Sequence, residues 1–186
     1  MNNYKILKFN YFISISLFFF ACEDNKTIYS DDTSDLEIKT ITTGNVNAAD
    51  FYFDLISVSE VDSIANWQLL IKTEGARNMP SVFFKDEIRV AVYEDLIFEE
   101  ILSLPETFEE DKEIDNSVFR YEGDHEILNY DITIHKVGVS NPSNVYIIND
   151  PELNKSFKLQ FIEYLSGVTI FHYKELEFMD FDTDPF

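Results

Sequence analysis

Short runs of aromatic and β-branched residues recur from about residue 40 onward, and turn residues separate one run from the next. In several runs apolar residues alternate with polar ones, which is the period of two that a strand produces and a helix does not. The pattern therefore predicts one all-β domain of mainly antiparallel sheet over residues 41–178. Its strands are expected at Phe51–Ser57, Trp67–Lys72, Ser81–Phe84, Ile88–Tyr93, Val118–Tyr121, Tyr130–Ile134, Val145–Ile148, Ser156–Leu165 and Val168–Tyr173.

The last two predicted strands carry the clearest local signal. Phe157, Leu159 and Phe161 alternate with polar residues, and Ser166-Gly167 separates this run from the next one. A serine and a glycine between two β-type runs are typical of a tight hairpin. Together with the strand expected at Val145–Ile148, this hairpin would close the domain as a three-strand antiparallel meander.

Four segments are too polar or too short to belong to a sheet. Residues 22–40 are mostly polar and acidic, cannot bury enough apolar surface to fold alone, and are expected to form a flexible tether. Residues 95–100 are expected to form one helical turn, and residues 105–116 an acidic surface loop. Residues 179–186 are expected to end the chain as an acidic tail.

The first 21 residues are predicted to be a bacterial lipoprotein signal peptide. Lys5 and Lys8 supply the basic start, Tyr11–Ala21 is almost wholly apolar, and Ala21 is the small residue at the cut. The apolar run is too short for a comfortable membrane-spanning helix, which needs about 20 residues. The segment is therefore expected to be removed from the mature chain.

Cys22 is the predicted site of lipidation. Phe19-Phe20-Ala21-Cys22 resembles the lipobox of bacterial lipoproteins, in which the cysteine is joined to diacylglycerol, and Cys22 is the only cysteine of 186 residues. Each buried CH₂ of an acyl chain contributes about 0.8 kcal/mol, so two or three chains would hold the protein at the lipid bilayer stably. Glu23-Asp24 directly after the cysteine looks like the acidic signal that moves some outer-membrane lipoproteins to the cell surface. A solvated acidic linker explains these residues equally well, so the face of the outer membrane that carries the protein stays open.

The charge of the chain excludes one class of partner. The full sequence has a formal net charge of −21, and loss of the two signal-peptide lysines leaves 12 basic against 35 acidic side chains, or −23. Such a field repels phosphate backbones and anionic lipid headgroups. We therefore expect no nucleic-acid binding, and we expect attachment to the membrane through acyl chains alone.

The sequence carries no signature of a common enzyme. It has no glycine-rich phosphate loop, no Gly-x-Ser-x-Gly elbow and no His-Glu-x-x-His motif. The single cysteine is assigned to lipid, and the three histidines lack the spacing of a zinc site. We therefore predict that the protein is not an enzyme.

The order of segments resembles the HmuY family, which are haem-binding lipoproteins anchored in the outer membrane of Gram-negative bacteria. Asn144–Asp150, Lys155–Tyr164 and Gly167–Glu175 are similar to the closing three strands of that family. Phe51–Leu55 and Asp62–Trp67 resemble its early pair of strands. The resemblance covers roughly residues 40 to 176 and implies an HmuY-like all-β fold at the outer membrane.

The resemblance also implies a function, which is capture of haem and its delivery to a TonB-dependent outer-membrane receptor. The best-known members hold haem between two histidines, and the positions that match most nearly are His125, after a Gly-Asp turn, and His135. Other members use methionine ligands, for which Met79 is the candidate. His172 follows the period of the last strand and is expected to be an exposed or packed residue, not a ligand.

A second hypothesis remains open beside haem binding. His135 does not fall at the position of the family's second histidine, so the chain could keep the fold without the haem. It would then be a surface interaction module that contacts protein or glycan.

Overall fold

The structure is a computed structural model that describes residues 37–75, 77–110 and 118–176. The predicted signal peptide, Cys22, nearly all of the predicted tether and the acidic tail lie outside these residues. So do most residues of the acidic loop expected at 105–116.

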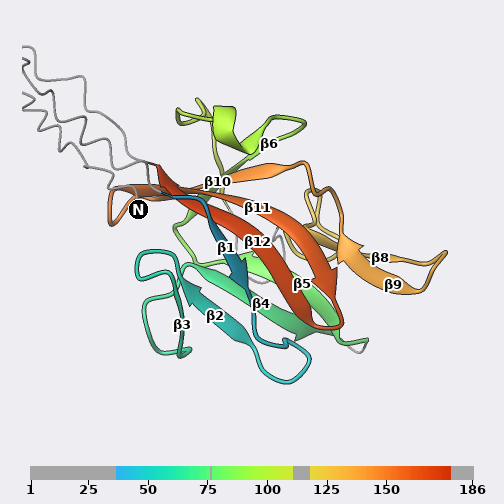
Figure 1. The fold of residues 1–186 in the computed structure, drawn as a ribbon. Helices are drawn as coiled ribbons and strands as arrows, with labels where there is room; N and C mark the ends of the chain where they lie inside the picture. The colour runs from blue at the N-terminus through green and yellow to red at the C-terminus, as the bar shows by residue number, and fades with distance from the viewer. Residues whose placement is uncertain (1–36, 76, 111–117, 177–186) are drawn as a thin grey trace, which may run out of the picture. The chain divides into compact units, whose positions relative to one another are not determined.

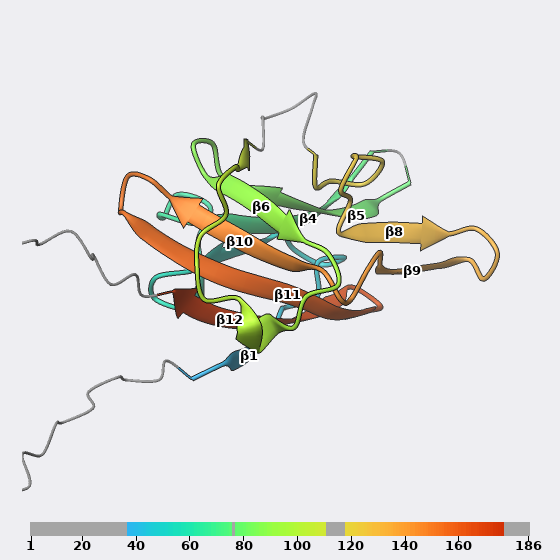
Figure 2. The same ribbon diagram turned by 90° about the horizontal axis from the view of Figure 1, so that it is seen from above.

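The described residues form an all-β fold in which every strand pair is antiparallel (Figure 1). Sheet A has six strands in the order β1 (Lys39–Thr42), β12 (Val168–Leu176), β11 (Lys155–Leu165), β10 (Val145–Asp150), β6 (Arg89–Tyr93) and β7 (Glu109–Glu110). Sheet B has four strands in the order β3 (Ser59–Val61), β2 (Phe51–Asp54), β4 (Leu69–Glu74) and β5 (Met79–Phe84). A separate hairpin pairs β8 (Leu128–Asp131) with β9 (Lys136–Val139) and projects from the rest in both ribbon views (Figure 1 and Figure 2). The prediction of a single all-β domain is confirmed.

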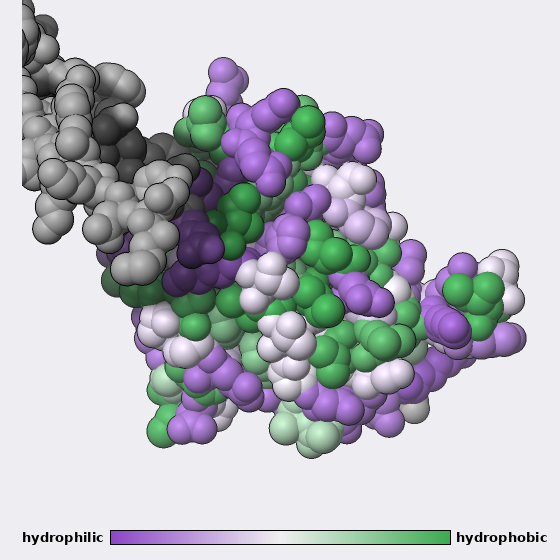
Figure 3. All heavy atoms as spheres, in the orientation of Figure 1, coloured by the Kyte–Doolittle hydropathy of each residue, from purple (hydrophilic) through white to green (hydrophobic). Residues whose placement is uncertain are grey.

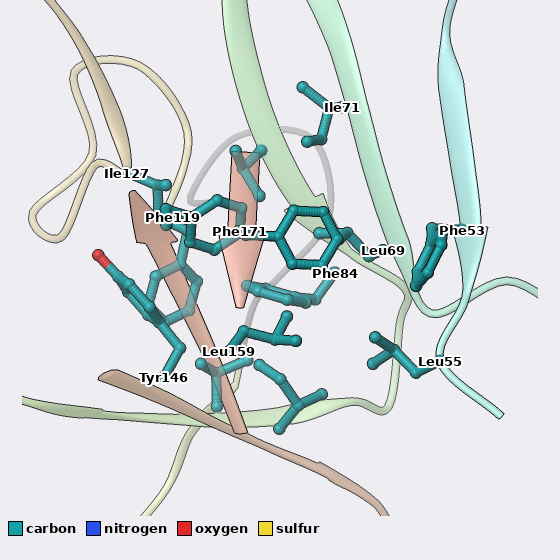
Figure 4. Close-up of a cluster of buried hydrophobic side chains, with 14 of the residues drawn as sticks. Phe53, Leu55, Leu69, Ile71, Phe84, Phe119, Ile127, Tyr146, Leu159 and Phe171 are labelled. Atoms are coloured by element: carbon teal, nitrogen blue, oxygen red, sulfur yellow. The ribbon is translucent and has the colours of Figure 1, made fainter. Parts of the chain in front are cut away.

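The main core fills the space between sheets A and B. Phe53 of sheet B meets Phe171 of sheet A edge to face, with ring centroids 5.7 Å apart (Figure 4). The buried hydroxyl of Tyr173 donates to the backbone oxygen of Leu55 at 2.7 Å, which adds a polar tie between the same two layers. Burying one aromatic or aliphatic side chain of this kind contributes roughly 1.5–3 kcal/mol. Packing of the two sheets therefore supplies most of the stabilisation.

The closing hairpin and meander agree with the prediction. β11 ends at Leu165 and β12 begins at Val168, and the intervening Ser166 and Gly167 both have positive φ, as a two-residue turn of type I′ requires. β10 pairs with β11 and β11 with β12, which forms the expected three-strand meander.

Other boundaries differ from the sequence pattern. Val118–Tyr121 forms bends and a turn, not a strand, because its backbone closes a loop: His125 N donates to Val118 O at 2.9 Å, and Ile127 N donates to Phe119 O at 3.1 Å. Strands β1, β3, β7 and β9 were not expected, because each has only two to four residues, too few to show a clear period of two. β1 begins at Lys39, slightly before the predicted domain boundary.

The helical turn expected at residues 95–100 is the 3₁₀ turn η1 (Phe98–Glu100).

A loop that we call the strap, residues 94–108, covers part of the outer face of sheet A. Phe98 and Ile101 of the strap are buried in a second apolar cluster with Ile147 of β10. Lys158 of β11 is 1 % exposed beneath it. Its amine donates to Phe98 O, donates to Ile101 O at 3.1 Å, and lies 4.5 Å from the centre of the Phe98 ring. A buried lysine thus fastens the strap to the sheet.

None of the described residues belongs to a helix that is long and apolar enough to cross a membrane.

We predict that Lys158→Met destabilises the domain and loosens the strap. Burial lowers the pKa of the Lys158 amine, but the larger effect of the substitution is that two buried carbonyls lose their donor, a loss of about 1–3 kcal/mol. Urea unfolding and hydrogen exchange of the strap amides measure the effect. Lys155→Met is the control, since that amine pairs with Glu175 at a partly exposed position, where such pairs contribute about 1 kcal/mol or less. Unchanged strap exchange in Lys158→Met would contradict the prediction.

We predict that Gly167→Ala costs about 1–3 kcal/mol of stability. Gly167 has a φ of +97°, and a Cβ placed there would lie 2.0 Å from Oδ1 of Asn45. Gly138→Ala in β9 is the matched control, because a Cβ there meets nothing within 4 Å. Equal melting midpoints for the two variants would show that the turn tolerates a side chain.

We predict a loss of stability at high pH to which Tyr146 contributes. Burial raises the pKa of Tyr146 from 10.0 to about 12, so the folded chain holds this proton longer than the unfolded chain does. Its contribution is complete below pH 10 and is lost as the pH approaches about 12, at up to about 2.7 kcal/mol. The unfolding free energy should therefore fall less steeply in Tyr146→Phe, and identical slopes would refute the assignment.

Candidate functional site

A hollow of about 690 Å³ opens between the β4–β5 turn and the loop of residues 118–126. It is lined by Glu74, Gly75, Arg77, Met79, Ser81, Arg120, Tyr121 and Glu122. This volume is within the range of roughly 300–1,000 Å³ that small-molecule and cofactor sites occupy.

Local backbone geometry builds the two walls of the hollow. In the β4–β5 turn, Gly75 and Asn78 have positive φ, and Asn78 N donates to Gly75 O at 3.2 Å. In the opposite wall, Gly123 N donates to Arg120 O at 2.9 Å. Tyr121 N donates to Ser81 Oγ at 3.3 Å, which joins that wall to β5. The two walls are therefore turns closed by backbone hydrogen bonds, and each turn is attached to sheet B.

The loop of residues 118–126 is anchored by one aromatic ring. Phe119 is fully buried and meets Phe84 of β5 edge to face, with centroids 5.5 Å apart, and Tyr146 of β10 with centroids 6.1 Å apart. Because this ring sits in the core between the sheets (Figure 4), the neighbouring Arg120 and Tyr121 are held at the surface.

The hollow holds two of the few cationic side chains of this acidic chain, together with two carboxylates. The sequence has three arginines, and two of them, Arg77 and Arg120, line this site. A guanidinium group presents paired donors that suit a carboxylate or another planar anion. Of the two lining acids, Glu74 is paired with Lys72 at 3.4 Å. The arrangement is suited to an acidic ligand with an apolar or polarisable part.

Two further lining residues are of types that coordinate haem iron. Met79, the first residue of β5, carries a thioether, and Tyr121 carries a phenol; both residues are half-buried. Methionine and tyrosine are both known axial ligands of haem iron. The methionine considered from the sequence thus lies in the hollow.

His125 lies in the loop that forms one wall of the hollow but is not among its lining residues. Its ring is half-buried and stacks on Phe119, with centroids 6.5 Å apart. His135 lies in the turn of the β8–β9 hairpin with a φ of +53°, and its ring is exposed. Its Nδ1 is hydrogen-bonded to the hydroxyl of Tyr130 at 2.7 Å.

The register of the hairpin places these two histidines at opposite ends. Leu128 pairs with Val139 and Asp131 with Lys136, so His125 precedes the base of the hairpin while His135 lies in its turn. The strand between them spans roughly 10 Å at about 3.3 Å per residue. The structure does not bring the two predicted haem ligands together, and each imidazole has a different aromatic neighbour.

The third histidine, His172 on β12, is half-buried and packs against the Phe98 ring of the strap, with centroids 6.0 Å apart. Of the two alternatives left open for His172, exposed or packed, the structure shows a half-buried ring with one aromatic neighbour.

Sequence reasoning missed Arg77, Arg120 and Tyr121. They come from two turns that are far apart in the chain, and neither turn contains a recognisable motif. The only signal in the sequence that could have indicated them is the low number of arginines. With three arginines among 186 residues, two arginines at one site would be unusual.

Among residues 37–75, 77–110 and 118–176, no group of three His, Cys, Asp or Glu side chains could hold a metal ion. In comparisons with known proteins, the chain matches no family profile, no curated protein and no solved structure.

Proposed function

We propose that this chain is an outer-membrane lipoprotein that binds haem and delivers it to a TonB-dependent receptor. The proposal begins from the resemblance to the HmuY family and from the lipobox-like sequence that ends at Cys22. The observation that carries it is the hollow, in which two of the chain's three arginines lie beside a methionine and a tyrosine.

The donor set of the hollow fits haem. Haem has an iron that accepts one or two axial ligands and two propionates that carry negative charge. Met79 and Tyr121 would supply axial ligands, and Arg77 and Arg120 would hold the propionates through charge-assisted hydrogen bonds. Bound in this way, haem would be carried as a cargo, and the protein would perform no chemical step on it.

The histidine ligands predicted from the sequence, His125 and His135, would place haem outside this hollow. His125 and His135 would bind one iron only if the β8–β9 hairpin moved, because its register holds them at opposite ends. We therefore propose the hollow as the first site to test and the histidine pair as the second.

Titration of the purified full chain with haemin, followed by the visible absorption of bound haem, tests the proposal. We predict that Met79→Ala with Tyr121→Phe weakens binding at least tenfold, since the iron loses both ligands. Arg77→Gln with Arg120→Gln should weaken it about 10–100-fold, which corresponds to one or two lost charged hydrogen bonds. Arg89→Gln is the matched control, because this exposed third arginine lies on β6, outside the hollow.

The histidine variants separate the two sites. His125→Ala with His135→Ala should leave the affinity within about threefold of the parent if the hollow binds haem. Complete loss in that variant, with hollow variants that bind normally, would assign the iron to the histidines. No change in haemin absorption with the parent chain would refute haem binding altogether.

The second candidate is a haem-free surface module of the same fold that contacts protein or glycan. The separation of His125 from His135 favours it, because the family's best-known ligand pair is then not assembled. Failure of the haemin titration, with the domain folded by circular dichroism, would leave this as the function to pursue.

A further inference from the structure

The strap presents four apolar side chains to solvent, although it is fixed to the sheet. Leu96, Ile97, Leu102 and Leu104 are 45 %, 57 %, 77 % and 37 % exposed. Leu96 and Ile97 line one hollow, and exposed apolar groups gathered in one place mark interaction sites. The buried amine of Lys158 fixes the strap backbone at Phe98 and Ile101, each of which is next to one of these exposed residues.

Acidic residues alternate with the apolar ones along the strap. Glu94, Asp95, Glu99, Glu100 and Glu106 are all exposed. Figure 3 shows hydrophobic and hydrophilic residues side by side in this region, at the top of the view, where the strap lies above β10 in Figure 1. The surface is thus apolar and negative at the same time.

Beside the strap lies a hollow of about 420 Å³. It is lined by Asp95, Leu96, Ile97, Phe98, Glu99, Pro142, Ser143 and Gln160. No basic residue is among these lining residues, whereas two carboxylates and three large apolar residues are. A lysine or arginine side chain fits such a site, because its methylene stem can lie on the apolar wall while its charge meets Asp95 and Glu99.

Charge also decides between the classes of partner. A second copy of this chain would bring a net charge of −21 against another −21, and repulsion opposes that contact. An anionic membrane is repelled for the same reason. A protein segment that combines apolar residues with lysine or arginine satisfies both the exposed side chains and the carboxylates.

We propose that the strap and its adjacent hollow form a docking site for a basic, apolar segment of a partner protein. This site is distinct from the arginine-lined hollow between the β4–β5 turn and residues 118–126, and it does not depend on haem binding. The partner segment contributes apolar side chains against Ile97 and Leu102 and a cationic side chain to the hollow.

Two synthetic peptides of equal length test the site, one alternating leucine with lysine and the other alternating leucine with glutamate. Fluorescence anisotropy with the full chain should detect binding of the lysine peptide alone, and added salt should weaken it. Ile97→Ser with Leu102→Ser should reduce the affinity at least tenfold. Asp95→Asn with Glu99→Gln should reduce it about tenfold and flatten the salt dependence.

Matched controls separate docking from general attraction to an acidic protein. Ile64→Ser removes a side chain that is 95 % exposed outside the strap, and Asp62→Asn removes an exposed acid outside it. Both controls should bind the lysine peptide within twofold of the parent chain. Equal losses in the controls and the strap variants would overturn the proposal.

Three other outcomes would also overturn it. Equal binding of the glutamate peptide would remove the role of charge. A dimer in sedimentation velocity that Ile97→Ser with Leu102→Ser dissociates would assign the strap to self-association. Binding of the parent chain to phosphatidylcholine vesicles, lost in the same variant, would assign it to a lipid surface.

Discussion

Phe53 of β2 and Phe171 of β12 meet edge to face between the two sheets, and the rest of the domain depends on this layer of packed rings. The sequence offers no other strong source of stability. Its one cysteine lies at position 22, so no disulfide can close the folded domain. Apolar burial between sheets A and B must then offset the entropy of ordering the chain. The two proposed sites lie at the margins of that packed layer.

At each proposed site, one buried side chain attaches an irregular segment to a sheet. For the arginine-lined hollow the residue is Phe119, whose ring is buried between β5 and β10 while its neighbours remain at the surface. For the strap it is Lys158, whose amine satisfies two strap carbonyls on the outer face of sheet A. In both cases an irregular segment gains a fixed geometry from a rigid sheet. Segments positioned in this way lose less freedom when a ligand binds, which favours affinity.

Three of the few cationic side chains of the chain lie at the two proposed sites. Arg77 and Arg120 gather at one hollow, and Lys158 is buried under the strap. The strap carries exposed acids with no lining cation at its hollow, whereas the other hollow combines two arginines with two glutamates. The two surfaces therefore differ in the charged groups that they offer to a ligand or partner.

The sequence by itself determined the parts of this protein that depend on neighbouring residues. Alternation at Phe157, Leu159 and Phe161 and the Ser166-Gly167 turn are local signals, and they predicted the closing meander because strand period and turn geometry are fixed within a few residues. Val118–Tyr121 has a similar composition but forms a loop, since its one buried ring, Phe119, is held by contacts with β5 and β10.

Only the tertiary structure decided which distant residues meet. The pattern placed Lys158 on the polar side of its strand, but burial of that side depends on a loop from elsewhere in the chain. His125 and His135 are near neighbours in sequence, yet β8 extends between them and places them at opposite ends of a hairpin. Arg77 and Arg120 are far apart in sequence and line one hollow. Distance along the sequence does not determine distance in the folded chain, because strand pairing and sheet packing bring remote segments together. The proposed sites therefore depend on the tertiary structure.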